Sequence, residues 1–388
     1  MPYDVEMFES MDCSEKKRIL IVFGTRPEAI KMAPLAKALM QDDNFEVGVC
    51  VTAQHRQLLD KVMDFFDIRP DYDLDLMKAN QSLASLSADI IRDMDKIIGE
   101  FNPHMVLVHG DTSTSTFSAL AAFYRKVPVG HVEAGLRTHQ RYAPFPEEIN
   151  RQLTGRIADL HFSPTASARE NLIREGVDAS RIFVTGNTVI DALFWAKDKL
   201  RTYRDAEIDA LESLLDSAKK TVLVTAHRRE SFGQGMKEIC TALAQLARRQ
   251  DIIMLFPVHP NPNVRDLMYE RLGEIKSIHL IEPLGYPAFA WLMARAYLII
   301  TDSGGIQEEA PSLGKPVLVL REVSERPEAI VSGGVILVGT DAQRIVTEAM
   351  QLLDVESRYT AMASTQNPYG DGHSVPRVVS LVKKFFNL

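Results

Sequence analysis

Short apolar runs alternate with longer segments of helical periodicity along most of the chain. Six runs in the first half have the β-branched composition of buried strands: RILIVFG, EVGVCVT, HMVLVHG, VPVGHVE, ADLHFSP and RIFVTGN. The first is followed by TRPEAIKMAPLAKALM, which predicts a helix with Thr25 as its N-cap and Pro27 in its first turn. Nearly continuous apolar strands separated by helices indicate a parallel sheet covered on both faces.

The pattern changes between Val189 and Lys220, where the chain is charged and helical and contains no strand. Strands then resume with TVLVTAH, DIIMLFPVH, SIHLIEP, YLIITDSG, KPVLVLR and GVILVGT. We therefore predict an α/β fold of two doubly wound Rossmann-like domains, residues 1–188 and 189–369, that face a central cleft. The last segment, 370–388, predicts an amphipathic helix that could pack back onto the first domain.

Composition and charge exclude several function classes. The 388 residues carry a net charge of −8 without a Lys/Arg-rich stripe, so a nucleic-acid partner is not expected. Three widely separated cysteines, Cys13, Cys50 and Cys240, form no metal-like pair and suit a reducing compartment. The acidic N-terminus lacks the apolar core of a signal peptide, and no apolar run reaches transmembrane length. We expect a cytoplasmic protein without a membrane partner.

Candidate ligand-binding residues follow the predicted strands. In open parallel sheets ligands bind beyond the C-terminal ends of the strands, so two such edges would form one interdomain cleft. The polar residues at these ends are Gly24-Thr25-Arg26, Gly110-Asp111, Glu133, His227-Arg228, His259 and Ser303-Gly304-Gly305.

The segment TDSGGIQEEA resembles a phosphate-binding turn. A strand end is followed by two glycines and a helix, so free backbone N–H groups and the helix dipole could hold a phosphate. Glu308 and Glu309 lie one turn into that helix, where a carboxylate can bind ribose hydroxyls. A tight turn with acids favoured by the helix N-terminus is an equally good interpretation. Arg321 and Arg326, near the next strand end, favour a diphosphate.

Other candidates have simple structural alternatives. Arg26 and Lys31 could be solvated bases, since FGTRPEAIK is neither a Walker A loop nor a dinucleotide fingerprint. Asp111 could be a helix N-cap, and His227 a structural histidine. Segment 131–151 is harder to explain as a solvated helix face, because prolines at 144 and 146 interrupt it. Its charged residues are Glu133, Arg137, Arg141, Glu147, Glu148 and Arg151.

No dinucleotide fingerprint and no metal-ligand cluster occurs, so neither a nicotinamide cofactor nor a metal is expected. What remains is acid–base chemistry by carboxylates and a histidine on a phosphate-bearing ligand.

The chain resembles the non-hydrolysing UDP-N-acetylglucosamine 2-epimerases. The resemblance is collinear from about Lys17 to Gly339 and includes NPYGDG near the C-terminus. It rests on FGTRPEAIKMAPL, HGDTSTST, HVEAGLR, PFPEEINR, TGNTVIDAL, TAHRRES, TDSGGIQEEAPSLGKPVLVLR and ERPEA. It implies the GT-B architecture, a homodimer, and interconversion of UDP-GlcNAc and UDP-ManNAc that supplies ManNAc units for cell-surface polysaccharide.

The reaction that the resemblance implies needs no cofactor. The sugar C2 proton is not acidic, but UDP on C1 is a good leaving group, so elimination gives a 2-acetamidoglucal. Protonation of the other face of C2 and re-addition of UDP give the epimer. This chemistry needs acid–base groups near C2 and cations on the diphosphate.

The resemblance also implies roles for individual residues. Asp111, Glu133 and Glu147 match the acid–base groups at the sugar, and His227 matches a histidine at the diphosphate. The remaining matches to substrate-binding positions are Arg26, Lys31, Phe289, Ser303, Gly304, Gly305, Glu309 and Arg326. Gln54, Gln57, Arg228 and His259 match positions that bind a second UDP-GlcNAc as an activator in some bacterial members. TAQHR could equally be a plain βα turn near the cleft.

Two departures from the family pattern stand out. Leu284 replaces a glutamine that contacts uridine, and His139-Gln140 replaces a Gly-Asp pair after HVEAGLRT. A hydrolysing epimerase or a GT-B UDP-sugar glycosyltransferase is the alternative enzyme. A non-catalytic nucleotide-sugar sensor is the alternative outside catalysis.

Overall fold

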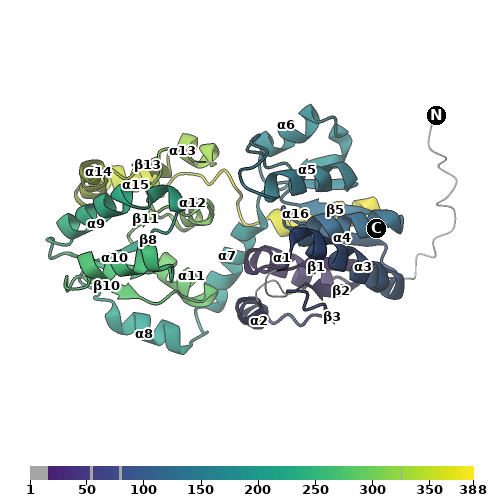
Figure 1. The fold of residues 1–388 in the computed structure, drawn as a ribbon, viewed down its shortest axis with the longest axis horizontal. Helices are drawn as coiled ribbons and strands as arrows, with labels where there is room; N and C mark the ends of the chain where they lie inside the picture. The colour runs from purple at the N-terminus through teal and green to yellow at the C-terminus, as the bar shows by residue number, and fades with distance from the viewer. Residues whose placement is uncertain (1–15, 53–55, 78–80, 325) are drawn as a thin grey trace.

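The computed structural model describes residues 16–52, 56–77, 81–324 and 326–388. Two parallel sheets form the two halves of the molecule (Figure 1). The first has the order β3 (Tyr72–Asp73), β2 (Phe45–Val51), β1 (Lys17–Phe23), β4 (Met105–His109), β5 (Val129–Val132), β6 (Leu160–Ser163), β7 (Ile182–Val184). The second has the order β10 (Ile278–Ile281), β9 (Ile252–Pro257), β8 (Lys220–Thr225), β11 (Leu298–Thr301), β12 (Val317–Val319), β13 (Val335–Leu337).

Both sheets have the doubly wound order, in which the strand sequence reverses beside the first strand of each half. In the first sheet this switch lies between β1 and β4, and in the second it lies between β8 and β11. The predicted fold class is therefore confirmed. The two-residue strand β3 was not expected from the sequence, because so short a strand leaves no periodic signal.

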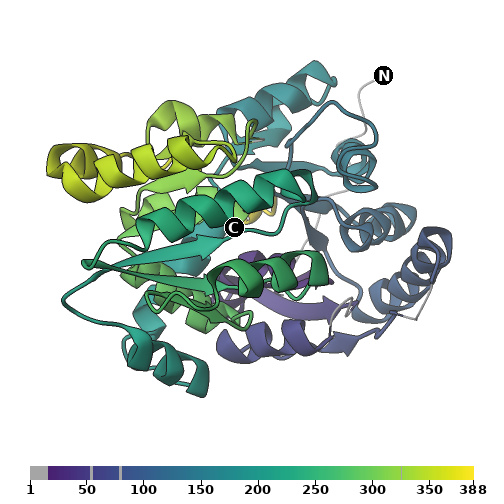
Figure 2. The ribbon, with the colours of Figure 1, turned by 60° about the vertical axis from the view of Figure 1, so that its left-hand side comes forward.

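Helices cover both faces of each sheet (Figures 1 and 2). Those of the first half are α1 (Arg26–Met40), α2 (Arg56–Phe65), α3 (Leu83–Phe101), α4 (Ser113–Tyr124), α5 (Glu147–Ile157) and α6 (Ala166–Arg174). Those of the second are α8 (Ala206–Leu214), α9 (Gln234–Leu246), α10 (Pro262–Leu272), α11 (Tyr286–Arg295), α12 (Gly304–Glu309), α13 (Pro327–Ser332), α14 (Ala342–Asp354) and α15 (Glu356–Ala363). Short 3₁₀ turns occur at 179–181, 229–231 and 310–313. None of the helices in the described parts of the chain is both long and apolar enough to cross a membrane.

The start of α1 is fixed as the sequence predicts. Thr25 is the N-cap, Pro27 lies in the first turn, and Glu28 completes a capping box. The buried Glu28 carboxylate also accepts hydrogen bonds from Gly24 N at 3.0 Å and from the Thr112 hydroxyl at 2.7 Å. Burial raises the pKa of Glu28, although these donors oppose the shift. The cap thus ties the end of β1 to the start of α4 and holds Arg26 at the strand edge.

Helix α7 (Thr188–Lys199) joins the two halves. It contacts α1 and α16 (Ser374–Phe385) on one side and α11 and α12 on the other. The C-terminal helix α16 lies against α1, beside the first sheet (Figure 1). Because α7 packs against both halves, the domain boundary at 188/189 stays a prediction.

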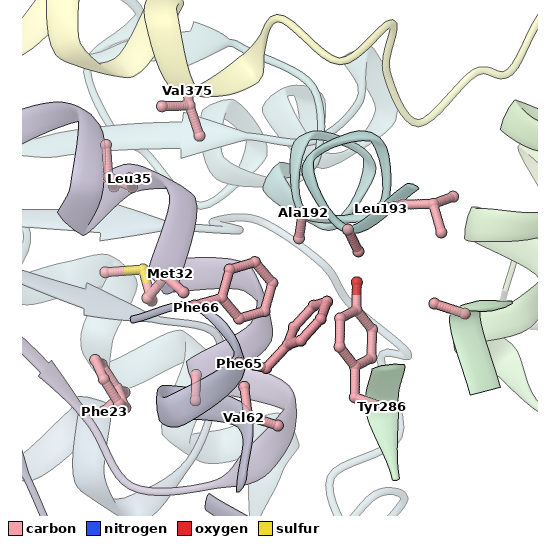
Figure 3. Close-up of a cluster of buried hydrophobic side chains, with 14 of the residues drawn as sticks. Phe23, Met32, Leu35, Val62, Phe65, Phe66, Ala192, Leu193, Tyr286 and Val375 are labelled. Atoms are coloured by element: carbon pink, nitrogen blue, oxygen red, sulfur yellow. The ribbon is translucent and has the colours of Figure 1, made fainter. Parts of the chain in front are cut away.

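An aromatic cluster packs across the same junction (Figure 3). Phe66, which follows α2, stacks on Trp195 of α7 with ring centroids 4.6 Å apart. It also stacks on Tyr286 of α11 at 5.8 Å. Phe65 meets the same two rings edge-on. The buried apolar core is therefore continuous from one sheet through α7 to the other.

Candidate active site

A cavity of about 470 Å³ lies between the two halves, at the C-terminal ends of the strands. This volume is in the range of small-molecule sites. The first half contributes residues of α1, and the second contributes strand ends and helix starts. The predicted site residues in its lining are Arg26, Lys31, His227, His259, Phe289, Ser303, Gly305, Glu309 and Arg326. Asp111, Glu133, Glu147, Gly304 and Arg228 do not line it.

Three cations converge on this cavity. Lys31 forms an ion pair with Glu133, and Arg326 forms one with Glu308. Arg26 has no hydrogen-bond or ion-pair partner among the described residues, and burial lowers the pKa of its guanidinium. A partly buried cation without a counter-ion is costly in a folded protein. The cavity is therefore suited to an anionic ligand.

Glu133 lies behind Lys31, directly after β5. Its backbone is left-handed, with φ of 62°, a conformation that costs about 1–3 kcal/mol for a non-glycine residue. Asn187 Nδ2 donates to its Oε2 at 2.7 Å, and His109 Nε2 lies 3.9 Å from Oε1. Burial favours the neutral acid, but Lys31 and His109 outweigh it and hold the pKa of Glu133 below its usual value. Glu133 is thus an ionised, oriented carboxylate in contact with a residue of the cavity lining, Lys31.

Asp111 and Glu147 lie near Glu133. Asp111 forms an ion pair with Arg151. Burial raises the pKa of Asp111; Arg151 opposes the shift, whereas Glu133 and Glu147 add to it. Glu147 is the first residue of α5, and its Oε2 is buried without a hydrogen-bond partner in the described parts of the chain. Carboxylates with different environments form one cluster, as acid–base catalysis requires.

The remaining charges of segment 131–151 hold its loop. Glu148 is fully buried and accepts hydrogen bonds from Thr138 N and His139 N, both at 3.1 Å. Arg151 donates to the same carboxylate at 3.2 Å, and so links it to Asp111. Arg137 pairs with Glu175 outside the segment. The dense charge therefore serves two purposes, since Glu148 shapes the loop while its neighbours form the carboxylate cluster.

The glycine turn at 303–305 is only partly as expected. Ser303 N–H donates to the Thr301 hydroxyl at 2.9 Å, so this amide is already engaged. Gly304 is buried, whereas Gly305 is exposed and lines the cavity. A Cβ on Gly305 would meet only Glu309 Oε1, at 3.6 Å. Close approach of a ligand to the backbone is therefore possible at Gly305.

His227 is fixed by a buried carboxylate. Its Nδ1 lies 3.1 Å from Oδ1 of Asp302, which has no exposed surface. Asp302 Oδ2 also accepts the backbone N–H groups of His227 and Arg228. The imidazole stacks on His259 with centroids 5.3 Å apart. Because Nδ1 faces Asp302, Nε2 is the nitrogen available to a ligand.

Part of the cavity lining is apolar, and one acid accompanies it. Leu284, Tyr286 and Phe289 line it together with Glu309. Burial raises the pKa of Glu309 to about 8, and Glu308 adds to the shift. At neutral pH Glu309 is therefore protonated and can donate a hydrogen bond to a ligand hydroxyl.

The four residues matched to an activator site are only partly described. Gln54 and the side chain of Gln57 lie outside the described residues. His259 lines the cavity, and Arg228 Nε is buried without a partner among the described residues.

Two polar residues at the site were missed as site residues: Asn187 and Asp302. Glu308, a candidate for the ribose, instead pairs with Arg326. Asn187 lies in the quoted motif TGNTVID and Asp302 in TDSGGIQEE, but each also has a simple local role at a helix start or turn. Their placement at strand ends was the available signal. No group of three or more His, Cys, Asp or Glu is placed to hold a metal within the described ranges.

Comparison with known proteins settles the family. The family model described as UDP-N-acetylglucosamine 2-epimerase matches residues 37–383. The chain belongs to this family. It is 56% identical over 369 residues to the UDP-N-acetylglucosamine 2-epimerase of Escherichia coli K12, covering 94% of this chain and 98% of the relative. The chain is accordingly an isomerase, a UDP-GlcNAc 2-epimerase.

Solved structures of similar proteins agree with this family assignment. The Neisseria meningitidis UDP-GlcNAc 2-epimerase bound to UDP-GlcNAc is 46% identical, with a TM-score of 0.86 and coverage of 95% of this chain and 100% of that one. The S. aureus MnaA–UDP co-structure is 47% identical, with a TM-score of 0.83 and coverage of 96% and 97%. The two-domain arrangement of the epimerase is thus GT-B-like.

Proposed function

We propose that this epimerase is non-hydrolysing and interconverts UDP-GlcNAc and UDP-ManNAc by elimination and re-addition of UDP. The observation that supports this most is the cluster of Asp111, Glu133 and Glu147 beside the three cations of the cavity. Acid–base groups and a diphosphate site are then adjacent, as the reaction requires.

In the first step a carboxylate takes the C2 proton as the C1–O bond to UDP breaks. The electron pair of the C2–H bond forms the C1=C2 double bond, and UDP leaves with the electron pair of the C1–O bond. The product is 2-acetamidoglucal. In the second step a carboxylic acid returns a proton to the opposite face of C2, and a phosphate oxygen of UDP re-forms the bond to C1.

Residues of the two halves have different roles in this proposal. Asp111, Glu133 and Glu147 serve C2, with the ionised Glu133 suited to accept a proton. Asp111, whose pKa is raised by burial against the effect of Arg151, is the proposed carboxylic acid that returns one. Arg26, Lys31 and Arg326 stabilise the charge of departing UDP, and His227 Nε2 binds or protonates it.

Uridine occupies the apolar part of the cavity in the same proposal. Phe289 faces uracil, Glu309 binds the ribose, and Ser303 to Gly305 approach the phosphates. Leu284, which replaces the family's glutamine, gives the base an apolar contact instead of a hydrogen bond.

Three finer points extend the proposal. A second UDP-GlcNAc binds beside the catalytic site as an activator, supported by Arg228 and His259. The enzyme is a homodimer, supported by the adjacent exposed rings of Phe123 and Tyr124 on α4. It acts in the cytoplasm, which is supported by the buried Cys50 and Cys240, since free cysteines suit a reducing compartment. There it supplies ManNAc units for cell-surface polysaccharide.

The experiment is proton NMR of UDP-GlcNAc and enzyme in heavy water. We expect deuterium at C2 of both UDP-GlcNAc and UDP-ManNAc, with the nucleotide sugars intact. Stoichiometric release of ManNAc and UDP would instead indicate a hydrolysing epimerase. Transfer of GlcNAc to an added acceptor without C2 deuteration would indicate a glycosyltransferase.

A further inference from the structure

We propose that Asn187 is a positioning residue for Glu133 and couples this carboxylate to the diphosphate cations. The inference rests on the proposed role of Glu133 in C2 proton transfer. Asn187 precedes α7, the helix that joins the two halves, and is almost completely buried.

One amide nitrogen holds carboxylates from both halves of the enzyme. Asn187 Nδ2 donates to Glu133 Oε2 at 2.7 Å and to Glu308 Oε2 at 2.8 Å. Each carboxylate also pairs with a cation of the cavity, Glu133 with Lys31 and Glu308 with Arg326. The four charged groups and the amide therefore form one continuous chain from the carboxylate cluster to the diphosphate site.

Asparagine is chemically suited to this position. Two carboxylates that face one point repel each other, and only a group with two N–H donors can satisfy both without adding charge. Aspartate has no donor, and serine has one hydroxyl on a shorter side chain.

The orientation of the amide is fixed by its other atom. Asn187 Oδ1 accepts the backbone N–H of Val189 at 3.1 Å as the N-cap of α7. This contact requires the oxygen to face the helix, so the NH₂ group must face the two carboxylates.

The NPYGDG segment, for which the catalytic proposal has no role, holds two members of the bridge, Asn187 and Glu308. Asn187 N–H donates to the Tyr369 carbonyl at 2.6 Å. Asn367 Nδ2 donates to the Glu308 carbonyl, also at 2.6 Å. The segment that leads to α16 therefore fixes Asn187 relative to Glu308.

The bridge has a consequence for catalysis. A diphosphate that binds Lys31 and Arg326 competes with Glu133 and Glu308 for these cations. When Lys31 and Arg326 bind the diphosphate, the Asn187 amide still donates hydrogen bonds to both carboxylates and maintains the orientation of Glu133. Asn187 thus allows one set of cations to hold the leaving group while Glu133 stays in position.

Two variants test the bridge while keeping the helix cap. Asn187→Ser retains an N-cap oxygen without charge, and Asn187→Asp retains volume and cap but has no donor. We expect Asn187→Ser to lower kcat at least about tenfold, the loss of one charge-assisted hydrogen bond, and to change the UDP Kd less than about threefold. Asn187→Asp should lower kcat further, and should weaken UDP binding through its added negative charge.

The decisive measurement is the primary isotope effect on epimerisation of C2-deuterated UDP-GlcNAc and UDP-ManNAc. If Glu133 is misplaced, proton transfer becomes slower, so the isotope effect should rise for at least one of the two substrates. Loss of folded enzyme would lower the rate but would leave the isotope effect unchanged. Asp341→Ser, which likewise replaces the N-cap residue of a helix, α14, is the matched control. This control should leave kcat and the isotope effect unchanged. Should Asn187→Ser fail to fold, the near-isosteric Asn187→Asp allows the comparison of kcat and of the isotope effect, although not that of UDP affinity.

The outcomes separate the two proposals. A kcat within twofold of wild type and an unchanged isotope effect in the Asn187 variants, while wild type deuterates C2, would overturn the role of Asn187 alone. Absence of C2 deuteration by wild type would overturn the proposed mechanism, and with it this inference.

Discussion

Lys31 on α1 and Glu133 at the end of β5 form an ion pair in which both side chains are largely buried, with exposures of 16% and 10%. Of these two residues, Lys31 lines the cavity and Glu133 does not. In the proposed mechanism the pair connects leaving-group stabilisation with proton transfer, because a diphosphate that attracts Lys31 would weaken the ion pair between Lys31 and Glu133.

Glu133→Gln should lower kcat by about 10²-fold or more, the usual loss for a missing acid–base group, while UDP still binds. Glutamine keeps the size of the side chain but cannot accept the proton. Steady-state kinetics and calorimetry with UDP measure the two effects. Asp95→Asn, in an exposed ion pair with Arg125, is the control and should behave as wild type. Near-normal turnover of Glu133→Gln would remove Glu133 from the chemistry.

The raised pKa of Glu309 leads us to expect that UDP binding depends on pH. Its pKa is raised to about 8 by burial, so it is a neutral donor at pH 7 and becomes a carboxylate as pH rises through 8. The added charge should weaken UDP binding between pH 7.5 and 9.5, a window above the phosphate pKa of about 6. Calorimetry should show this loss in wild type but not in Glu309→Gln. Equal slopes in both proteins would contradict the assignment.

The raised pKa of Glu309 also makes the free energy of unfolding depend on pH. Between its ordinary pKa of 4.5 and about 8, Glu309 binds more protons in the folded than in the unfolded state. Its contribution to the free energy of unfolding therefore falls as pH rises through this window. Urea unfolding of wild type and Glu309→Gln, both without UDP, should show this decrease in wild type alone.

Two variants of Tyr286 distinguish the contribution of packing from that of hydrogen bonding to stability at the interdomain junction. Its ring is buried against Phe65 and Phe66, whereas its hydroxyl is buried without a partner among the described residues (Figure 3). Tyr286→Ala should lower the free energy of unfolding by about 3–5 kcal/mol. Tyr286→Phe should leave it unchanged or raise it slightly, because an unsatisfied polar group is removed. Denaturant unfolding without ligand measures both, and a large loss in Tyr286→Phe would reveal a bond to the hydroxyl.

Much of the fold could be predicted because its signals are local. The apolar strand runs, the Thr25 cap and the amphipathic C-terminal segment each specify an element from adjacent residues. Strand ends also indicated part of the cavity lining, since parallel strands bring their ends to one edge: Arg26, His227, His259, Ser303 and Gly305 line the cavity.

The partners within the site could not be predicted in the same way. Asn187 meets Glu308 across 121 positions of sequence, and only the crossing of α7 between the halves brings them together. Likewise, Glu148 and Glu147 are neighbours in sequence, yet one holds a loop and the other joins the carboxylate cluster. Long-range placement decides such roles, and periodicity does not report it.

The last prediction concerns the diphosphate site. Gly305 rather than Gly304 lines the cavity, and a Cβ atom added there would lie near only one protein atom, Glu309 Oε1. Gly305→Val should therefore fold normally but fill the space needed by the phosphates. Arg326→Ala removes a charge-assisted bond of about 1.5–3 kcal/mol. Each variant should weaken UDP binding at least about tenfold, since about 1.4 kcal/mol is one decade.

Arg326→Ala should also release UDP and 2-acetamidoglucal into solution, because the leaving group is no longer held for re-addition. Calorimetry measures the affinity, and NMR of the reaction mixture detects the glucal. Arg358→Ala breaks an ion pair with Glu348 in the same half of the chain, outside the cavity, and is the matched control. Unchanged UDP affinity in both site variants would falsify the position of the diphosphate. Weakened binding without free glucal would mean that sugar contacts alone retain the intermediate.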